Sequence, residues 1–273
     1  PTKTKKRNGL RELPSELWNL IEPLLPPDKP PGANGRPRVA NRTVLNGILY
    51  VLRTGCQWKM IPREYGSGST CHLRFQTWAR AGVFQKVWGK CLKHYDDLRG
   101  IDWRFQSLDS ATVSAPVKGG IKPEKTYDRG KLGTKRHVLT DANGIPLAVT
   151  LSGANRHDMK MFGATLDAVV VSRPSPKKKP RQHLCNDKGY DYPEIRRSAA
   201  RRGYIAHIKS RGQEEKERKK NPRYKARRWV VERSNRWHNL FRRLKIRYEV
   251  HAENYLAFVQ FASAIICWRS AAA

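Results

Sequence analysis

Three acidic residues, Asp109, Asp187 and Glu232, stand where their carboxylates could act together. Asp109 and Asp187 each follow a short stretch with strand character, so both are expected near strand ends, where an open α/β sheet usually binds its ligands. Converging carboxylates bind divalent cations and support phosphoryl transfer. A single Asp after a strand is more often a turn or helix-capping residue, so the interpretation depends on the joint placement of all three.

Glu232 is the only acid in the arginine-rich stretch 223–247, which is predicted to be a helix. Apolar residues recur along it at helical spacing, namely Val230, Trp237, Phe241 and Leu244. The opposite face is polar and contains Arg228, Glu232, Asn235, Arg236 and Asn239. Glu232 could form two surface ion pairs there, or it could bind a metal ion beside arginines that bind phosphate.

Basic residues dominate the composition, since 55 Lys and Arg stand against 23 Asp and Glu, for a net charge of +32 and a pI of about 10.5. Such an excess over the whole length is typical of proteins that bind the phosphate backbone of nucleic acid. No apolar run approaches the roughly 18–20 residues that span a membrane, and the first residues lack the apolar core of a signal peptide. The sequence therefore predicts a cytoplasmic protein that binds nucleic acid and no membrane.

Residues 1–12 are basic and are expected to form a flexible arm, whereas residues 13–100 are predicted to form an all-α DNA-binding domain. Start and stop signals place its helices at about 13–25, 41–53, 69–82 and 83–98. This pattern resembles a helix-turn-helix module, whose second helix would present His72, Arg74 and Gln76 to a DNA groove. A plain helical bundle with charged outer faces explains the same pattern.

The Pro- and Gly-rich linker between the first two helices ends in two arginines, Arg36 and Arg38. It is either a solvated loop or an arm that enters the minor groove of DNA. Both arginines are candidate DNA contacts.

A change of composition at Asp102 marks a second domain, predicted over residues 101–273. Its elements follow the order strand, strand, strand, helix, strand, helix, strand, helix, with a two-residue hairpin turn at Asn143-Gly144. The first of these helices is expected over about 157–171, and the apolar C-terminal helix is expected to pack against the sheet. A mixed α/β (α+β) sheet flanked by helices, with acids on its first and fourth strands and on a late helix, matches the ribonuclease-H-like (RNase-H-like) arrangement.

Long, ordered motifs cover nearly the whole chain: ELWNLIEPLLPP with GRPR, GCQWKMIP, LDSATVSA, YDRGKLGTKRHVLTDANGIPLAVTLSGANRHD, NDKGYD and RRWVVERSNRWHNLFRRLKIRYE. With them the sequence resembles the DDE-type transposases of bacterial insertion sequences, in particular the insertion-sequence-five group. The resemblance implies that Asp109, Asp187 and Glu232 hold two Mg²⁺ (or Mn²⁺) ions and that the enzyme cleaves DNA at element ends and joins the 3′ ends to target DNA. It also implies a homodimer on terminal inverted repeats, associated with the nucleoid in the bacterial cytosol.

The resemblance includes a Tyr-Arg-Glu-Lys signature around the catalytic Glu. Arg228 stands where the signature has its Arg, four residues before Glu232. The place of the Tyr is taken by Lys225, with Tyr224 adjacent, and the place of the Lys is taken by Asn239. Another basic residue would therefore have to bind phosphate in place of that Lys.

Several basic residues are candidates for contacts with DNA. Arg236 and Arg243 are possible substitutes for the missing Lys of the signature. Lys131, Lys135 and Lys188 lie in or beside the motifs that carry the resemblance.

His157 and Asp158 belong to the same motifs, and they fit the start of a helix, with Asp158 near its positive end, better than a role beside the metal ions. Two other functions would fit parts of the sequence. One is a non-catalytic, sequence-specific DNA-binding protein, against which the presence of all three acids argues. The other is a simple metal-dependent DNA nuclease, which would give no strand-transfer products.

Overall fold

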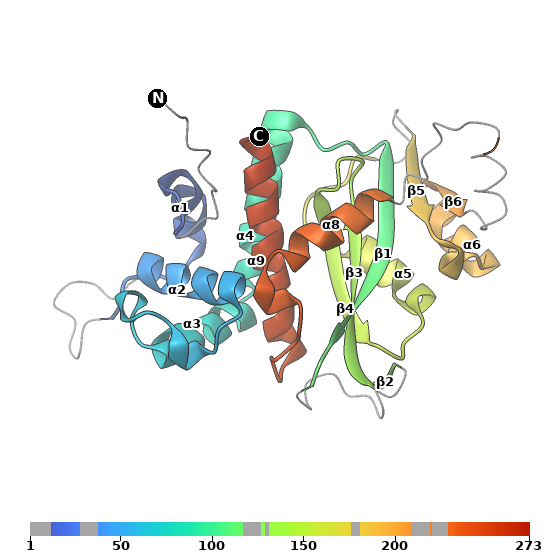
Figure 1. Ribbon diagram of the computed structural model, residues 1–273. Coiled ribbons are helices and arrows are strands. Elements are labelled where there is room, and N and C mark those ends of the chain that lie inside the picture. The colour runs from blue at the N-terminus through green and yellow to red at the C-terminus, as the bar shows by residue number, and fades with distance from the viewer. Residues whose placement is uncertain are drawn as a thin grey trace.

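The computed structural model describes residues 12–27, 38–116, 127–128, 131–175, 181–208, 219 and 229–273. A helical region, a pair of long helices and a sheet with helices on both faces follow one another across the molecule (Figure 1). One hydrophobic core extends through all three parts. None of the described helices combines the length and the apolar character that crossing a bilayer requires.

The N-terminal region is helical, as expected. Its elements are α1 (Ser15–Ile21), η1 (Glu22–Leu24), α2 (Asn41–Thr54), η2 (Trp58–Met60), η3 (Arg63–Tyr65), α3 (Gly68–Arg80) and α4 (Val83–Arg99). Gly55 ends α2 with a left-handed φ of 72°, which fits the predicted cap. The N-cap of α3 is Ser67, whose Oγ accepts a hydrogen bond from Thr70 N at 3.1 Å, so α3 begins slightly before the predicted start at about residue 69.

The connection between α2 and α3 departs from an ordinary helix-turn-helix. It spans residues 55–67 and contains two 3-10 turns, η2 and η3. A helix-turn-helix turn has only about 3–4 residues. The two helices nevertheless pack against each other, and Tyr65 of the connection is buried in the core.

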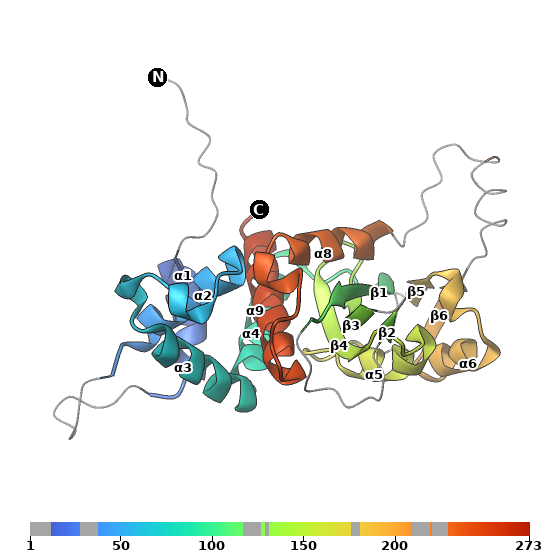
Figure 2. The ribbon, with the colours of Figure 1, turned by 60° about the horizontal axis from the view of Figure 1, so that its bottom comes forward.

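The C-terminal helix α9 (Ala252–Ala271) packs along α4, and the two lie side by side in both views (Figures 1 and 2). The ring of Phe258 on α9 stacks on Phe75 of α3 with 4.2 Å between centroids. Trp88 on α4 donates a hydrogen bond to Pro146 O, at the sheet, at 3.2 Å. The prediction that this helix packs against the sheet was therefore incomplete, because α9 contacts both the sheet and the N-terminal helices.

Five strands form the main sheet: β1 (Phe105–Ser114), β3 (Lys131–Thr140), β4 (Pro146–Gly153), β5 (Gln182–Asn186) and β6 (Tyr204–Ile208). Their order is β4-β3-β1-β5-β6, and the two-residue β2 (Tyr127–Asp128) pairs with the start of β3. β3 is antiparallel to β1 and β4, whereas β1, β5 and β6 are parallel. The central strand β1 thus joins an antiparallel half to a parallel half, which is the predicted RNase-H-like arrangement.

Helices cover both faces of this sheet. On one face α8 (Trp229–Asn239) crosses β1 and β3, and on the other lie α5 (Phe162–Asp167) and α6 (Pro193–Arg201) (Figure 2). Three short 3-10 turns complete this half of the molecule, namely η4 (Asp158–Met161) before α5, η5 (Lys188–Tyr190) before α6 and η6 (Arg242–Leu244) after α8.

Two helices end earlier than predicted. α8 ends at Asn239, and the chain turns there so that Phe241 and Leu244 enter the core beside α2, instead of continuing one apolar stripe to 247. Residues 223–228 of the predicted helix lie outside the described part of the chain. α5 ends at Asp167 because the chain then runs along β4, where Val170 N donates to Leu147 O at 3.1 Å.

The turn between β3 and β4 is longer than the predicted two residues. Asp141 organises it, because its carboxylate accepts hydrogen bonds from Asn143 N at 2.9 Å and from Ile145 N at 2.8 Å. Gly144 completes the turn with a φ of 78°. A positive φ at this place favours glycine strongly.

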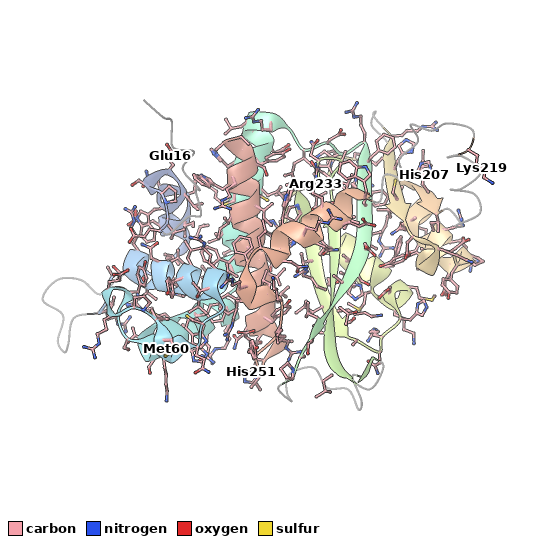
Figure 3. The ribbon with its side chains drawn as sticks, in the orientation of Figure 1. Glu16, Met60, His207, Lys219, Arg233 and His251 are labelled. Carbon is pink, nitrogen blue, oxygen red and sulfur yellow. The ribbon has the colours of Figure 1, made fainter. Side chains whose placement is uncertain are left out.

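This turn also supports α8. Ser234 of α8 donates its hydroxyl hydrogen to Gly144 O, and Arg233, labelled in Figure 3, donates to Asn143 O. The carbonyl oxygens of a tight turn thus bind the helix that bears Glu232. The position of α8 on the sheet therefore depends on the conformation of the turn.

We expect Gly144→Ala to destabilise the protein more than Gly82→Ala. Both glycines have a left-handed φ, 78° and 68°, so alanine adds about 1 kcal/mol of backbone strain at each. A Cβ at Gly144 would also lie 3.2 Å from the Arg233 guanidinium and 3.3 Å from Val230 O, whereas at Gly82 it would meet nothing within 4 Å. Urea unfolding should show a loss about 1 kcal/mol larger for Gly144→Ala. Equal losses would mean that α8 does not depend on this turn.

Candidate functional site

Asp109 lies where the two halves of the sheet separate. The pairing of β1 with β5 ends at Ser107 and Cys185, whereas the pairing of β1 with β3 continues to Ser114. Asp109 is therefore in the middle of β1 and not at its end, as was predicted. It nevertheless lies just beyond the last residue of β1 that pairs with β5. On the side of β1 that faces β5, Asp109 is therefore placed as if it followed the end of a strand.

The register of β1 and β3 gives the direction of the Asp109 side chain. Residues directly opposite each other in an antiparallel pair project to the same face, and alternate residues share a face. Asp109 is opposite Val138, two residues from Arg136. Arg136 is fully buried and donates to Asn235 Oδ1 on α8 at 3.3 Å. Asp109 therefore projects to the face that α8 covers.

Asp187 follows β5 directly and begins η5. Its Oδ1 accepts a hydrogen bond from Gly189 N at 2.8 Å, which fixes the carboxylate in a turn. The preceding residue, Asn186, donates its side-chain amide to Leu108 O at 3.3 Å. This bond ties the end of β5 to β1 next to Asp109.

Glu232 is an exposed residue in the first turn of α8. α8 is held against the sheet by Val231 and Ser234, and by the buried Arg136, which also donates to Asn239 Oδ1 at 3.4 Å. Asn239, which stands where the family signature has Lys, therefore accepts a hydrogen bond from the sheet. Asn235 and Asn239 follow Glu232 at positions i+3 and i+7 and lie on the same face of α8, so Glu232 is on the side of the helix that Arg136 binds.

The pKa of Asp109 depends on its burial and on the charges of other acids around it. Burial raises the pKa of Asp109 to about 6, although a hydrogen bond from the backbone of Ser110 lowers it, and the charges of Asp187, Asp158 and Glu232 raise it further, in that order. The first and third of these charges belong to the predicted triad. Three elements separated in sequence thus direct negative charge at one carboxyl group.

These carboxylates could hold a divalent cation. Among the described residues, no group of three His, Cys, Asp or Glu lies close enough together to bind a metal ion as it stands. Carboxylates repel one another, which favours a wider separation while no cation is between them. They are still near enough for their charges to shift the pKa of a neighbouring acid. Their chemistry fits Mg²⁺ or Mn²⁺, which prefer carboxylate oxygen, and a cation would offset the charge that raises the pKa of Asp109.

Sequence reasoning missed one acid in this group. Asp158 does begin a helical segment, η4, as predicted, but its carboxylate pairs with Lys135 Nζ at 3.0 Å and its charge acts on Asp109. The only signal in the sequence was its place in the motif block. Lys135 was predicted to contact DNA, yet its ammonium is engaged with Asp158 and with Arg156 O at 2.9 Å.

Three predicted DNA contacts fall outside the described part of the chain or lack a described side chain. Arg36 and Arg228 lie outside the described residues. Lys131 is the first residue of β3, where only the backbone is described.

Three other predicted contacts are engaged within the protein. Arg243 is buried and binds Glu249, with Nε 2.7 Å from Oε1, so it does not fit the predicted phosphate-binding role. His72 stacks on Trp58 with 4.7 Å between ring centroids, and burial, with the nearby Arg243, lowers its pKa. Arg74 donates to Val39 O at 2.9 Å. Long-range partners of this kind leave no local pattern in a sequence.

Four predicted contacts are at least partly accessible. Arg236 is exposed on α8 one turn after Glu232, and Lys188 is exposed directly after Asp187. Arg38 is exposed beside a cavity of about 620 Å³ between the linker and α3, and Gln76 on α3 is half-buried. Two of the four therefore adjoin the candidate triad.

Two family models match the chain. The model described as "Transposase DDE domain" matches residues 102–266, and the model described as "Putative transposase of IS4/5 family" matches residues 13–88. The first match covers more than half of the chain and contains all three acids of the candidate triad.

Two proteins of Burkholderia cepacia are similar in sequence. One, described as "Putative transposase for insertion sequence element IS402", is 37% identical over 166 residues, which are 60% of this chain and 74% of that protein. The other, "Insertion element IS402 uncharacterized 16.2 kDa protein", is 43% identical over 108 residues, which are 38% of this chain and 74% of that protein.

Among solved structures, the "Crystal structure of a pre-cleavage Mos1 transpososome" aligns over 89% of this chain and 82% of that chain, with 10% identity and a TM-score of 0.31. Similarity at that level transfers no residue role. The family match and the sequence relatives are the findings that decide membership. By them, this protein belongs to the DDE transposases, as an insertion-sequence transposase of the IS4/5 family.

Proposed function

We propose that this transposase cleaves DNA and joins the 3′ ends to target DNA with Asp109, Asp187 and Glu232 as its catalytic carboxylates. The observation that carries the proposal is that α8 packs on β1 and that Asn186, next to Asp187, is hydrogen-bonded to Leu108, next to Asp109; the charges of Asp187 and Glu232 also raise the pKa of Asp109. The three acids come from β1, from the residue after β5 and from α8. Like charges that act on a largely buried carboxyl group are unfavourable for folding, so their placement around Asp109 favours a functional role.

The same three carboxylates would hold two divalent ions, Mg²⁺ or Mn²⁺. When bound, such ions supply positive charge that activates a water molecule or a 3′-hydroxyl and stabilises the leaving oxygen. The protein contributes the fixed position of each acid. The sheet holds Asp109, the turn at Gly189 holds Asp187, and the β3–β4 turn holds the helix that bears Glu232.

The basic residues around these acids would position the DNA backbone. Arg236 and Lys188 adjoin Glu232 and Asp187, and both side chains are exposed. Their charges would attract phosphate and orient it toward the carboxylates. Arg38 and Gln76 would bind DNA from the helical region, and Arg36, Arg228 and Lys131 remain predicted contacts. A homodimer would hold two element ends together.

The triad is tested by Asp109→Asn, Asp187→Asn and Glu232→Gln in cleavage and strand-transfer assays on DNA that carries the element ends, with Mg²⁺. Each substitution should lower the rate by about 10²- to 10³-fold or more. It removes a carboxylate that would hold a divalent ion, and that ion would stabilise the charge of the transition state by several kcal/mol. Asp191→Asn and Glu253→Gln remove exposed acids outside the triad and serve as matched controls. Cleavage unchanged in all three triad variants would refute the assignment.

The products of the same assay separate this function from its alternatives. Joined products with a 3′-OH donor are expected from the wild-type protein. Cleavage without joining would indicate a simple nuclease. Binding without cleavage would indicate a non-catalytic DNA-binding protein.

Asp109→Asn should also change the pH dependence of stability. The pKa of Asp109 is about 6 in the folded protein against an unperturbed 3.8. Below the unperturbed value both states are protonated, and as pH rises the unfolded chain loses its proton first. Wild-type stability therefore falls between about pH 4 and pH 6 and stays lowered above, by about 2–3 kcal/mol.

Asn does not ionise, so the variant escapes this loss. Urea unfolding without divalent cations should find Asp109→Asn more stable than the wild type by about 2 kcal/mol near pH 8 and equal to it near pH 4. A difference of the same size at both pH values would contradict the raised pKa.

A further inference from the structure

Neither helix capping nor ion pairing explains the position of Asp158. It is the first residue of η4, but no side chain caps this turn. Its carboxylate is bound by Lys135 Nζ at 3.0 Å, and both side chains are largely buried, with 29% and 17% of their surface exposed. A partly buried ion pair is costly to desolvate and adds little stability by itself.

The segment that bears Asp158 packs against the segment that bears Asp187. His157 contacts Tyr192 edge to face, with 5.7 Å between ring centroids, and Phe162 contacts Tyr190 at 6.0 Å. η4 and η5 are in direct contact. These contacts place the segment of Asp158 beside the segment that bears Asp187.

Asp158 acts on Asp109 more strongly than one member of the triad does. Its charge raises the pKa of Asp109 less than that of Asp187 but more than that of Glu232. If Glu232 is near enough to join Asp109 in binding a cation, the negative charge of Asp158 acts on the same cation.

A buried hydroxyl points to a ligand among these acids. Tyr190 is 1% exposed, and its hydroxyl has no hydrogen-bond partner among the described residues. Burial raises the pKa of Tyr190, and so do the charges of Asp158, Asp109 and Asp187. A buried hydroxyl without a partner is unfavourable, whereas a water molecule held by a cation among the acids would bond to it.

We propose that Asp158 is a fourth carboxylate of the cation site, which binds the hydration shell of the cation held by Asp109, and that Lys135 is the counter-charge that this cation displaces. The proposal rests on the proposed function of Asp109, Asp187 and Glu232. It assigns to Asp158 and Lys135 a role in cation binding that is separate from helix capping and from contact with DNA.

The geometry favours an outer position for Asp158. Lys135 is opposite Thr112 on β1 and projects to the face opposite that of Asp109. The pairing of β1 with β5 ends before Asp109, so no residue of β5 pairs with this part of β1. Water can bridge this separation, since Mg²⁺ keeps several waters when only one or two carboxylates bind it directly.

The test measures Mn²⁺ binding to the whole protein without DNA, from the loss of the electron paramagnetic resonance signal of free Mn²⁺. Asp158→Asn should weaken binding about tenfold, as loss of an outer partner of a metal site does. Lys135→Gln should tighten it, because the competing ammonium is removed. Thermal unfolding of each variant establishes that it is folded.

The matched control is Asp167→Asn, which removes the same charge from another ion pair of the same helical segment, that with Arg202 at 2.7 Å. It should leave Mn²⁺ binding unchanged. An equal loss of affinity in Asp167→Asn and Asp158→Asn would reduce the effect to general electrostatics and overturn the proposal, as would weaker binding in Lys135→Gln.

Asp109→Asn distinguishes this proposal from the function on which it rests. If Asp109→Asn weakens Mn²⁺ binding and Asp158→Asn does not, the fourth carboxylate is refuted and the triad stands. If Asp109→Asn has no effect on Mn²⁺ binding, the cation site itself is refuted, and the role of Asp158 with it.

Discussion

Repulsion between carboxylates is the constraint around which the catalytic half of this transposase is built. Asp109 is largely enclosed by the sheet and α8, and burial raises its pKa to about 6, with smaller contributions from the charges of Asp187, Asp158 and Glu232. A fold stabilises such a group only if rigid elements keep the acids from moving apart. Here each acid is attached to a different part of the sheet, so the repulsion acts against hydrogen-bonded strands and packed helices.

The attachment of α8 shows how this is achieved. The helix is bound at one end of the β3–β4 hairpin, through the carbonyl oxygens of Asn143 and Gly144. It is bound again in the middle of β3, through the buried Arg136. Two points fix both the position and the rotation of a helix. Glu232 is therefore oriented by the contacts that α8 makes with the hairpin turn and with Arg136, which binds Asn235 on the same face of the helix.

The sequence predicted the order of the strands and helices along the chain, because these depend on periodicity and on local turn signals, whereas the role of the three acids stays a prediction that rests on the family resemblance. It misplaced Asp109 because β1 continues with strand-like residues past the acid. It extended α8 because Phe241 and Leu244 keep helical spacing although they are buried beside α2. Lys135 pairs with an acid in a distant part of the chain, and Arg243 pairs with an acid beyond a turn. Residue type alone therefore suggested that both side chains are free to bind DNA.

The packing of α9 along α4 has a consequence for the order of folding during synthesis. α4 is synthesised well before α9, and its apolar face is covered by residues 252–271 of α9. Domains made early usually fold before the rest of the chain. In this protein the helical region gains its full core only when α9 arrives, so the packing of the helical region and that of the sheet are completed together.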